Sequence, residues 1–559
     1  MRQRLSRLVA VPALLVLAGC STQPPPAAPA TAPTAPAAQS QAQPAPTTAP
    51  SPTVPAAASP AASPITAPRN ESKGRAVYAW QTAIAPAWLD PQDNGALVTP
   101  YIFQYILHDA VVKHLPGQTF APSLAERYEI APDFKSATFR LRENVKFHNG
   151  DPVTSEDVKF TYENYRGANA QLLKSKTEQI ETPDARTIKF TFKEPFLDFL
   201  ILYGTPASGA GWVVPAKYYQ QVGADEFKKN PIGAGPFKLV QQKVGEELEF
   251  EAFADYWRHP PFLKTFIVRG VPEDTTRVAQ LKTGEVDLIF LGPGPLVETV
   301  KNDPNLQLAA ALGAMYWIEM VGWEKPDSPF HDIRVRQAVS LALDRDAINQ
   351  AEYLGLAQPV LNWVPDNWPG GITGPAPEHN LARAKQLLAE AGYPNGLDVD
   401  QITPITGSET VAERIIGHLR EAGIRTRLNR LERAAFDQKM REGPTAITGL
   451  IYNASSAPGD VMSRIRAFAT CKGVNSRTCV PEIDDLVARH DQSTNPQERE
   501  RLAADLQRYM WENHIFIGVF RQAALGGVGP RIANRWEDIW GAIPQYSTFG
   551  PYEDIQVKD

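Results

Sequence analysis

A long tract near the N-terminus limits where a folded body can begin. Residues 21–68 consist almost entirely of Pro, Ala, Thr, Ser and Gln, and this tract contains no charged side chain up to Arg69. Such a composition lacks the large apolar side chains that build a core, so the tract should stay extended and solvated. At about 3.1 Å per residue in polyproline II, it could reach up to about 150 Å. We therefore expect residues 20–68 to be a disordered tether and the folded body to begin near Arg69.

The residues before the tether have the build of an export signal. Three arginines precede an apolar run from Leu8 to Leu17, which is followed by Ala18, Gly19 and Cys20. This run is too short to span a membrane, but it suits a secretory signal peptide. The Leu-Ala-Gly-Cys ending resembles a bacterial lipobox, in which the cysteine becomes the lipidated N-terminus. We expect residues 1–19 to be removed and Cys20 to hold the protein to a membrane of the cell envelope, facing the periplasm; the alternative is an ordinary signal peptide with a coincidental cysteine.

Size and charge narrow the classes of partner. About 490 residues follow the tether, which is enough for two or three domains with their own cores. The formal net charge is −6, and removal of the three signal arginines leaves about −9. This balance argues against nucleic acid as a partner.

The remaining cysteines form an even pair in a chain marked for export. Cys471 and Cys479 enclose a short loop. Exported proteins meet oxidising conditions, so we predict a disulfide between them. Zinc is the competing use, but two cysteines with no histidine nearer than His490 make a poor site for four ligands.

Periodicity in the body indicates a mixed α/β protein. Alternation with period two predicts strands, and apolar residues at helical spacing predict helices, one of which starts after the N-cap residue Asp332. Glycine-rich or proline-rich turns separate these segments. The predicted strands are 137–142 and 187–192, the predicted helices are 333–353, 381–391 and 498–511, and the predicted turns are 149–152 and 232–236.

The motifs of common enzymes are missing from the sequence. It contains no G-x-S-x-G, S-x-x-K, H-E-x-x-H or G-x-x-x-x-G-K-[ST] pattern, and its 9 histidines show no metal-ligand spacing. His148, beside the turn at 149–152, is more often a packing residue than a catalytic base. We expect no catalytic residue, no metal site and no cofactor.

Aromatic residues are abundant in the predicted loops. The chain has 11 Trp and 17 Tyr, among them Trp363 beside a proline-rich stretch. Tyr and Trp combine a large contact area with a polar tip, which suits a cleft that encloses a ligand. Each of them is individually more often a core residue.

Several ordered motifs carry a family resemblance. They read LAERYEIAPDFKSATFRLRENVKFHNGDPVTSEDVKFTY at 124–162, NPIGAGPFKLV at 230–240, ADYWRHPPFLKTFIVRGVPEDTTRVAQLKTGEVDL at 254–288, HDIRVRQAVSLALDRDAI at 331–348 and ARAKQLLAEAGYPNG at 382–396. The chain thereby resembles the family 5 extracellular solute-binding proteins, which include the dipeptide and oligopeptide receptors of bacterial ABC importers. The resemblance covers essentially the whole body after the tether.

This resemblance implies an α/β, two-lobed periplasmic-binding-protein fold of type II, with an additional domain inserted in the first lobe. Lobe I would comprise 69–109, 230–312 and 520–559, the insert 110–229, and lobe II 313–519. The strands that cross between the lobes would lie near 314–321 and 515–524. Closure about such crossings is a hinge motion that buries the ligand.

The resemblance also implies where the ligand binds. Peptide receptors of the family usually place an aspartate after a strand of the second lobe, where it pairs with the peptide's α-ammonium. Asn453 stands at that position, and it cannot neutralise an ammonium, although Asp460 could substitute for it. The predicted ligand-binding residues are Tyr316, Trp317, Trp363, Tyr452, Asn453 and Asp460.

We accordingly interpret the chain as a monomeric, lipid-anchored receptor that captures a peptide or peptide-like solute and delivers it to an ABC permease in the inner membrane. A polar non-peptide ligand, such as an oligosaccharide or an opine-like compound, is the alternative that Asn453 favours. A secreted hydrolase would need an activated nucleophile with a base in reach, and no such pair is evident. A sensor domain would usually be joined to a transmembrane signalling element.

Overall fold

A computed structural model describes residues 71–558, except 94–97, 117, 206–207, 367, 369, 444–445, 456–459, 474 and 541–547. The predicted signal peptide, Cys20 and the tether lie outside these residues. Within the described part, no helix combines the length and the apolar character that crossing a membrane requires.

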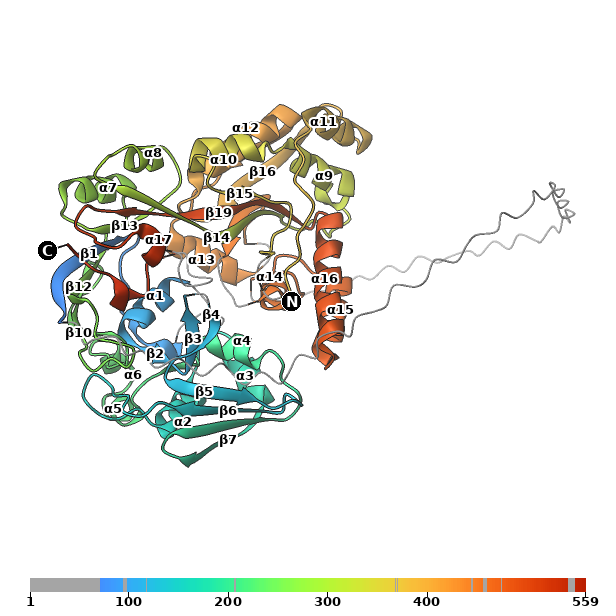
Figure 1. Cartoon of the computed structure of the whole chain (residues 1–559). Helices are drawn as coiled ribbons and strands as arrows, with labels where there is room; N and C mark the ends of the chain where they lie inside the picture. The colour runs from blue at the N-terminus through green and yellow to red at the C-terminus, as the bar shows by residue number, and fades with distance from the viewer. Residues whose placement is uncertain are drawn as a thin grey trace, which may run out of the picture. The chain divides into compact units, whose positions relative to one another are not determined.

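The central feature is an 11-stranded mixed sheet with the order β10-β11-β12-β1-β13-β19-β14-β18-β16-β17, in which β15 lies beside β19 (Figure 1). Strand β1 runs parallel to β12 and β13, and its apolar run Ala76–Trp80 is buried, as expected for a strand covered on both faces. The strands are β1 Lys73–Trp80, β10 Phe237–Lys243, β11 Glu247–Ala252, β12 Leu263–Gly270, β13 Leu288–Leu291, β14 Gln307–Met320, β15 Gln358–Pro359, β16 Leu397–Pro404, β17 Ile424–Leu428, β18 Leu450–Ser455 and β19 Phe516–Val528.

Two long antiparallel strands join the two halves of this sheet. β14 and β19 pair from Gln307 opposite Val528 to Glu319 opposite Phe516. β13 continues the sheet on the far side of β19, and β18 continues it on the far side of β14. The crossing strands predicted near 314–321 and 515–524 overlap the second half of β14 and the first part of β19.

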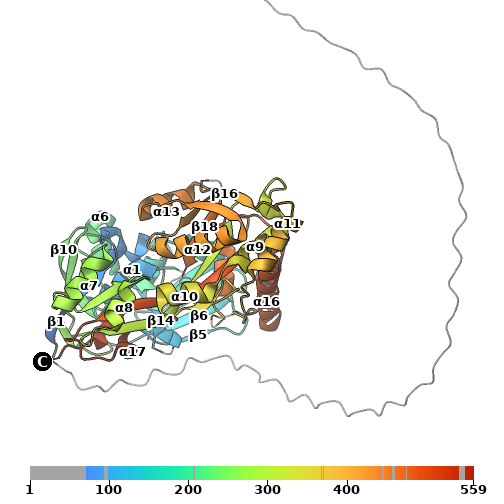
Figure 2. The same cartoon turned by 90° about the horizontal axis from the view of Figure 1, so that it is seen from above.

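Helices cover both faces of the main sheet (Figures 1 and 2). The predicted N-cap Asp332 is confirmed, because its carboxylate accepts a hydrogen bond from the Arg334 backbone N–H. The single helix predicted over 333–353 is wrong, because the chain breaks at Leu343 and Asp344 starts a second helix by accepting from Ala347 N at 2.9 Å. The helices of the main body are α1 Val98–Leu107, α7 Asp274–Thr283, α8 Leu296–Lys301, α9 Ile333–Ala342, α10 Arg345–Tyr353, α11 Leu381–Glu390, α12 Glu409–Ala422, α13 Arg433–Glu442, α14 Val461–Phe468, α15 Pro481–Gln492, α16 Pro496–Glu512 and α17 Trp536–Ile539.

The elements between α1 and β10 in the sequence form a second body of structure. It has a four-stranded antiparallel sheet, ordered β5-β6-β8-β7, with its own aromatic core around Phe139, Phe190 and Tyr203. The strands predicted over 137–142 and 187–192 correspond to β6 and β8. Its elements are β2 Asp109–Ala110, β3 Val112–Leu115, β4 Gln118–Pro122, β5 Ala125–Ile130, β6 Ser136–Leu141, α2 Ser155–Asn164, α3 Ala170–Lys176, β7 Thr177–Asp184, β8 Thr187–Phe192, α4 Phe199–Gly204, β9 Trp212–Val213, α5 Ala216–Val222 and α6 Ala224–Phe227.

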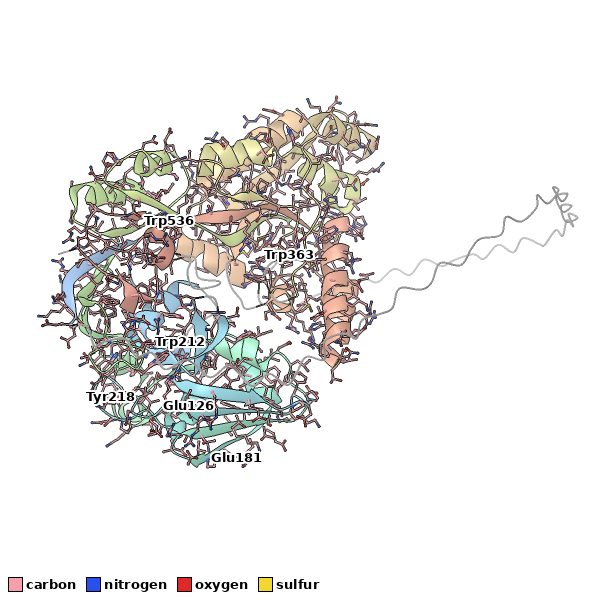
Figure 3. All side chains as sticks on the ribbon, viewed as in Figure 1. Glu126, Glu181, Trp212, Tyr218, Trp363 and Trp536 are labelled. Carbon is pink, nitrogen blue, oxygen red and sulfur yellow. A yellow bond between two sulfur atoms is a disulfide. The ribbon has the colours of Figure 1, made fainter. Side chains whose placement is uncertain are left out.

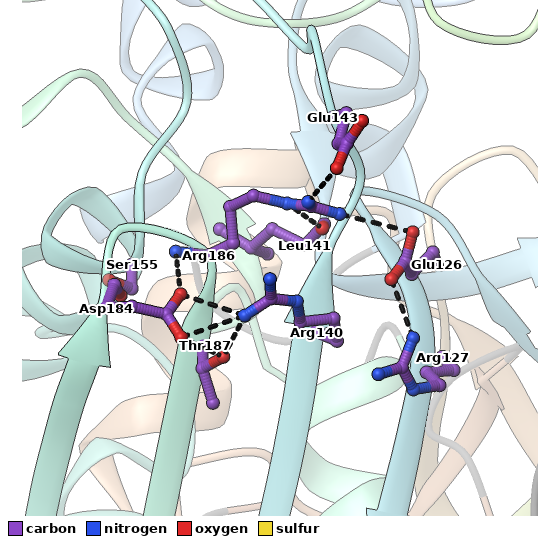
Figure 4. Close-up of polar contacts among 9 residues, drawn as sticks. All are labelled: Glu126, Arg127, Arg140, Leu141, Glu143, Ser155, Asp184, Arg186 and Thr187. Atoms are coloured by element: carbon purple, nitrogen blue, oxygen red, sulfur yellow. Dashed lines mark hydrogen bonds and ion pairs between the residues drawn. The ribbon is translucent and has the colours of Figure 1, made fainter.

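Charged residues at one end of this small sheet form a chain of ion pairs (Figure 4). Arg140 Nη1 lies 2.8 Å from Asp184 Oδ2, and Arg186 pairs with Glu126 at 3.3 Å and with Glu143. The Asp184 side chain is 52% exposed. Solvent screens such pairs, so they contribute little to stability individually.

Candidate functional site

A buried carboxylate forms the polar centre of the pairing between β14 and β18. Glu319 Oε1 accepts hydrogen bonds from Trp317 Nε1 at 2.8 Å and from Asn453 Nδ2 at 2.9 Å. The Glu319 side chain is only 3% exposed, and burial raises its pKa, although both hydrogen bonds oppose that rise. Neither bond uses Oε2, and the charge of Arg477 also acts to lower the pKa of this carboxyl.

The Asn453 side chain is held in one orientation. Its Oδ1 accepts from the Ala454 backbone N–H at 2.8 Å while its Nδ2 donates to Glu319. Asn453 stands directly opposite Trp317 in the register of the two strands. The structure therefore brings two of the predicted residues, Trp317 and Asn453, onto one carboxylate.

Aromatic rings and one cation surround Trp317. The Trp363 ring, labelled in Figure 3, lies 5.5 Å from it in an edge-on arrangement, and Phe468 lies at 5.3 Å. The Arg464 guanidinium faces the rings of Trp317 at 5.2 Å and Trp363 at 5.7 Å. Burial lowers the pKa of Arg464 to about 9, and the ring faces provide attraction to this cation.

Tyr316 and Tyr452 lie on the opposite face of the same strand pair. Their rings are 5.3 Å apart, and they pack with the cluster that contains Tyr353. Because successive side chains of a strand alternate between faces, Tyr316 cannot share a face with Trp317, nor Tyr452 with Asn453. The structure thus divides the predicted residues between two surfaces.

Asp460 forms the N-cap of α14. Its Oδ1 accepts from the Ser463 backbone N–H at 2.8 Å, and the residue is 5% exposed. Burial and then the nearby charge of Asp198 raise its pKa. In the described structure the Asp460 carboxylate therefore serves to cap helix α14.

An ionic network connects the second body of structure with α14 and α16. The Asp198 carboxylate, just before α4, contacts Arg466 Nη2 at 2.9 Å and also pairs with Arg499. Burial alone would raise the pKa of Asp198, but the two guanidiniums outweigh it and lower the pKa. Arg466 also pairs with Asp491.

The predicted disulfide is confirmed. Cys471 and Cys479 are joined, with an S–S distance of 2.06 Å. The Cys471 N–H donates to Asp484 Oδ1 of α15 at 3.0 Å, so the bridge fixes the loop between α14 and α15.

Sequence reasoning missed Glu319. It stands two residues after Trp317, so strand alternation places the two side chains on one face, and this signal was present in the sequence. No group of His, Cys, Asp and Glu in the described ranges is arranged to hold a metal ion.

Comparison with known proteins places the chain in a family. Residues 119–476 match the model of the bacterial extracellular solute-binding proteins, family 5. Heme-binding protein A of Haemophilus influenzae is 27% identical over 464 residues, which cover 76% of this chain and 83% of that protein. The glutathione-binding protein GsiB of Salmonella typhi is 24% identical over 469 residues, which cover 79% and 90%.

A solved structure agrees in fold. The periplasmic binding protein DppA from Helicobacter pylori, in complex with the peptide STSA, has a TM-score of 0.70 at 23% sequence identity, with 87% of this chain and 98% of that chain covered. The fold is therefore the two-lobed α/β fold of type II periplasmic binding proteins with an additional inserted domain. Since the matched family model spans more than half of the sequence, the chain belongs to the family 5 extracellular solute-binding proteins, the substrate-binding components of bacterial ABC importers.

Proposed function

We propose that this receptor captures a peptide or peptide-like solute with a free amino group in the cleft between its lobes and delivers it to an ABC permease. In this proposal the protein is a periplasmic monomer, held to a membrane by lipid on Cys20, and it performs no covalent chemistry. The lobes have the boundaries given above, 69–109 with 230–312 and 520–559 for lobe I and 313–519 for lobe II.

The observation that carries the proposal is the position of Glu319. Peptide receptors of the family usually have an aspartate where this chain has Asn453. Glu319 Oε1 lies 2.9 Å from Asn453 Nδ2, so a carboxylate is present one hydrogen bond away from that position. A ligand ammonium near Oε2 would stabilise the ionised form of a carboxylate whose pKa burial has raised.

The surroundings suit such a ligand. Trp317 and Trp363 are buried beside the carboxylate, and in this proposal their indole rings form part of the wall of the closed site. GsiB and DppA, whose names and complexes refer to glutathione and a peptide, are consistent with this class of solute. Tyr316 and Tyr452 would then support the floor of the site from the other face of the strands, and Asp460 would shape its rim through α14.

Mass spectrometry of small molecules released by denaturing the purified protein tests the ligand class. A tightly closing receptor should retain its solute, and we expect a compound with a primary amino group. Retention of a neutral oligosaccharide, or of an opine-like compound without such an amine, would contradict the peptide proposal and leave the receptor role intact.

Variants of the polar centre test the role of Glu319. Titration calorimetry with a pool of di- and tripeptides should show that Glu319→Gln weakens binding by about 100-fold or more, because removing one member of a buried ion pair typically costs about 3 to 5 kcal/mol. The matched control is Glu324→Gln, because Glu324 is a half-buried carboxylate just beyond β14. Asn453→Ala should cost about 1 to 3 kcal/mol through a lost hydrogen bond. Equal binding by the wild type and by both site variants would place the ligand elsewhere.

A further inference from the structure

Residues 471–479 form a strap that connects α14 to α15, and the disulfide closes the strap at its two ends. The described residues of this segment are fastened to both helices. On the side of α15, the Cys471 backbone N–H donates to Asp484 Oδ1 at 3.0 Å. On the side of α14, the Asn475 backbone N–H donates to Ala467 O at 2.9 Å. The bridged strap therefore holds the end of one helix beside the start of the next.

The strap packs closely against the last turn of α14. A Cβ atom placed on Gly473 would lie 2.6 Å from Arg466 O and 2.7 Å from Ala467 O, so only glycine fits there. These two carbonyls belong to the end of the helix, where no further turn supplies a donor. The Thr470 hydroxyl donates to Arg466 O at 2.7 Å, and the strap supplies the donor for Ala467 O. The position of the strap and that of the last turn of α14 are therefore set together.

Both helices that the strap joins contribute to the ionic network around Asp198. Arg466 of α14 donates to Asp198 Oδ2 at 2.9 Å and, through Nε, to Asp491 Oδ2 of α15 at 3.3 Å. The carbonyl of His490, also in α15, accepts from Arg499 Nη1 at 2.8 Å. Arg499 in turn pairs with Asp198. The two guanidiniums that hold Asp198 thus depend on the relative position of α14 and α15.

The bridge is accessible to a small reductant. Cys479 is exposed and Cys471 is half-buried, and both line a cavity of about 310 Å³, which admits a small dithiol. A thiolate of the dithiol attacks Cys479 Sγ, the S–S bond breaks, and Cys471 leaves as a thiolate that takes up a proton. The second thiol of the reductant then displaces Cys479. The protein gains two thiols, and the reductant becomes a cyclic disulfide.

We propose that the strap is a redox-sensitive switch for the contact between the second body of structure and the main body. While the bridge is intact, α14 and α15 keep Arg466 and Arg499 on the Asp198 carboxylate. Reduction frees the strap, so the two helices are no longer held in one relative position and the contact with Asp198 weakens. The reduced receptor opens more readily, and this inference does not depend on the class of solute.

Hydrogen exchange of the full-length protein, followed by mass spectrometry with and without dithiothreitol, measures this coupling at α4, which begins directly after Asp198. Alkylation of free thiols in the same samples gives the fraction of reduced bridge. The proteins are the wild type, the double variant Cys471→Ser, Cys479→Ser, the variant Asp198→Asn and the control Asp184→Asn. Asp184 is a carboxylate of the same body that pairs with Arg140 outside the network. Circular dichroism establishes that each protein is folded.

We expect reduction of the wild type and of Asp184→Asn to raise the exchange rate of the α4 amides by at least about 10-fold, and that of β6 and β8 by less than about 2-fold. The double cysteine variant should exchange like the reduced wild type and should not respond to dithiothreitol. Asp198→Asn should exchange rapidly at α4 with the bridge intact, and reduction should add less than about 2-fold, because the contact through which the strap acts is already lost.

Four results would overturn the proposal. Faster exchange confined to α14 and α15 would show that the bridge stabilises only its own surroundings. Equal acceleration of α4, β6 and β8 would show that reduction loosens the second body as a whole. An Asp198→Asn variant that responds to reduction as strongly as the wild type would show that the coupling does not pass through this carboxylate. A bridge that dithiothreitol leaves intact in the folded protein would show that the switch cannot operate.

Discussion

Asp198, at the start of α4, and Arg466, in α14, are separated by 268 residues in the chain, yet their side chains meet at 2.9 Å. Asp198 lies in the proposed insert and Arg466 in proposed lobe II. Together with Arg499 they form an ionic contact across the proposed lobe boundary, where the side chains are 10% to 22% exposed. This contact is placed to favour the closed arrangement of the lobes.

Asp198→Asn should destabilise that arrangement. Loss of the carboxylate leaves the Arg499 guanidinium without its acidic partner, and we expect the free energy of unfolding to fall by about 2 kcal/mol, below the range for fully buried pairs. Urea denaturation measures this change, and small-angle scattering should show a larger radius of gyration. Asp184→Asn, in the exposed network of Figure 4, is the control and should change stability much less than Asp198→Asn, because solvent screens its pairs. Equal effects of the two substitutions would argue against a special role of Asp198.

Removal of the disulfide should lower stability moderately. Cys471 and Cys479 are separated by 8 positions, and loop-closure entropy for such a short loop predicts about 2.5 kcal/mol. The double variant Cys471→Ser, Cys479→Ser should therefore melt at a lower temperature, and reduction of the wild type should reproduce the change. A variant as stable as the oxidised wild type would show that the loop is held by other contacts, such as the bond to Asp484.

His148 should make the protein sensitive to acid. Its Nδ1 accepts from the Gly233 N–H at 3.2 Å and its Nε2 lies 3.0 Å from Gly235 O, an arrangement that fits a neutral ring with the proton on Nε2. Burial lowers its pKa to about 3, and the charges of His108 and Lys238 act in the same direction. The unfolded chain then takes up the proton first, so the stability is present above about pH 6.5 and is lost as the pH falls toward about 3.

The expected loss from His148 alone is about 2 kcal/mol between pH 6.5 and 5. His148→Gln should flatten the dependence of unfolding free energy on pH by that amount. His379→Gln, which removes a ring that is 39% exposed, is the control variant. Parallel curves for the wild type and both variants would refute the assignment.

Cys20→Ala tests the lipid anchor, which rests on the sequence alone. In a bacterial host fed a labelled fatty acid, the wild type should incorporate the label and partition with membranes, whereas the variant should stay unlabelled and either be released or accumulate unprocessed. Equal labelling of the two proteins would exclude Cys20 as the attachment point.

Local sequence signals predicted the elements but not all of their ends. Period-two alternation at 187–192 matches β8, and the N-cap at Asp332 starts α9. The break between α9 and α10 was missed because apolar spacing continues through Leu343, while the capping contact of Asp344 becomes visible only in the structure.

The proposed binding site could be predicted only in part from the sequence, because its contacts join residues that lie far apart in the chain. Alignment to the family singled out Asn453, but the carboxylate that completes its environment belongs to Glu319, 134 residues away. Strand alternation could have separated Tyr316 from Trp317 in advance, because that rule is local.

The position of β19 in the sheet has a consequence for how the chain reaches its native state. β13 and β14 flank β19 on either side, so neither has its partner along that edge until residues 516–528 are available, near the end of synthesis. Sheets built from such distant segments fold slowly and leave strand edges open to wrong pairings in the meantime. Termination of translation before Phe516 should therefore yield a chain that aggregates or is degraded, rather than a smaller receptor with one working lobe.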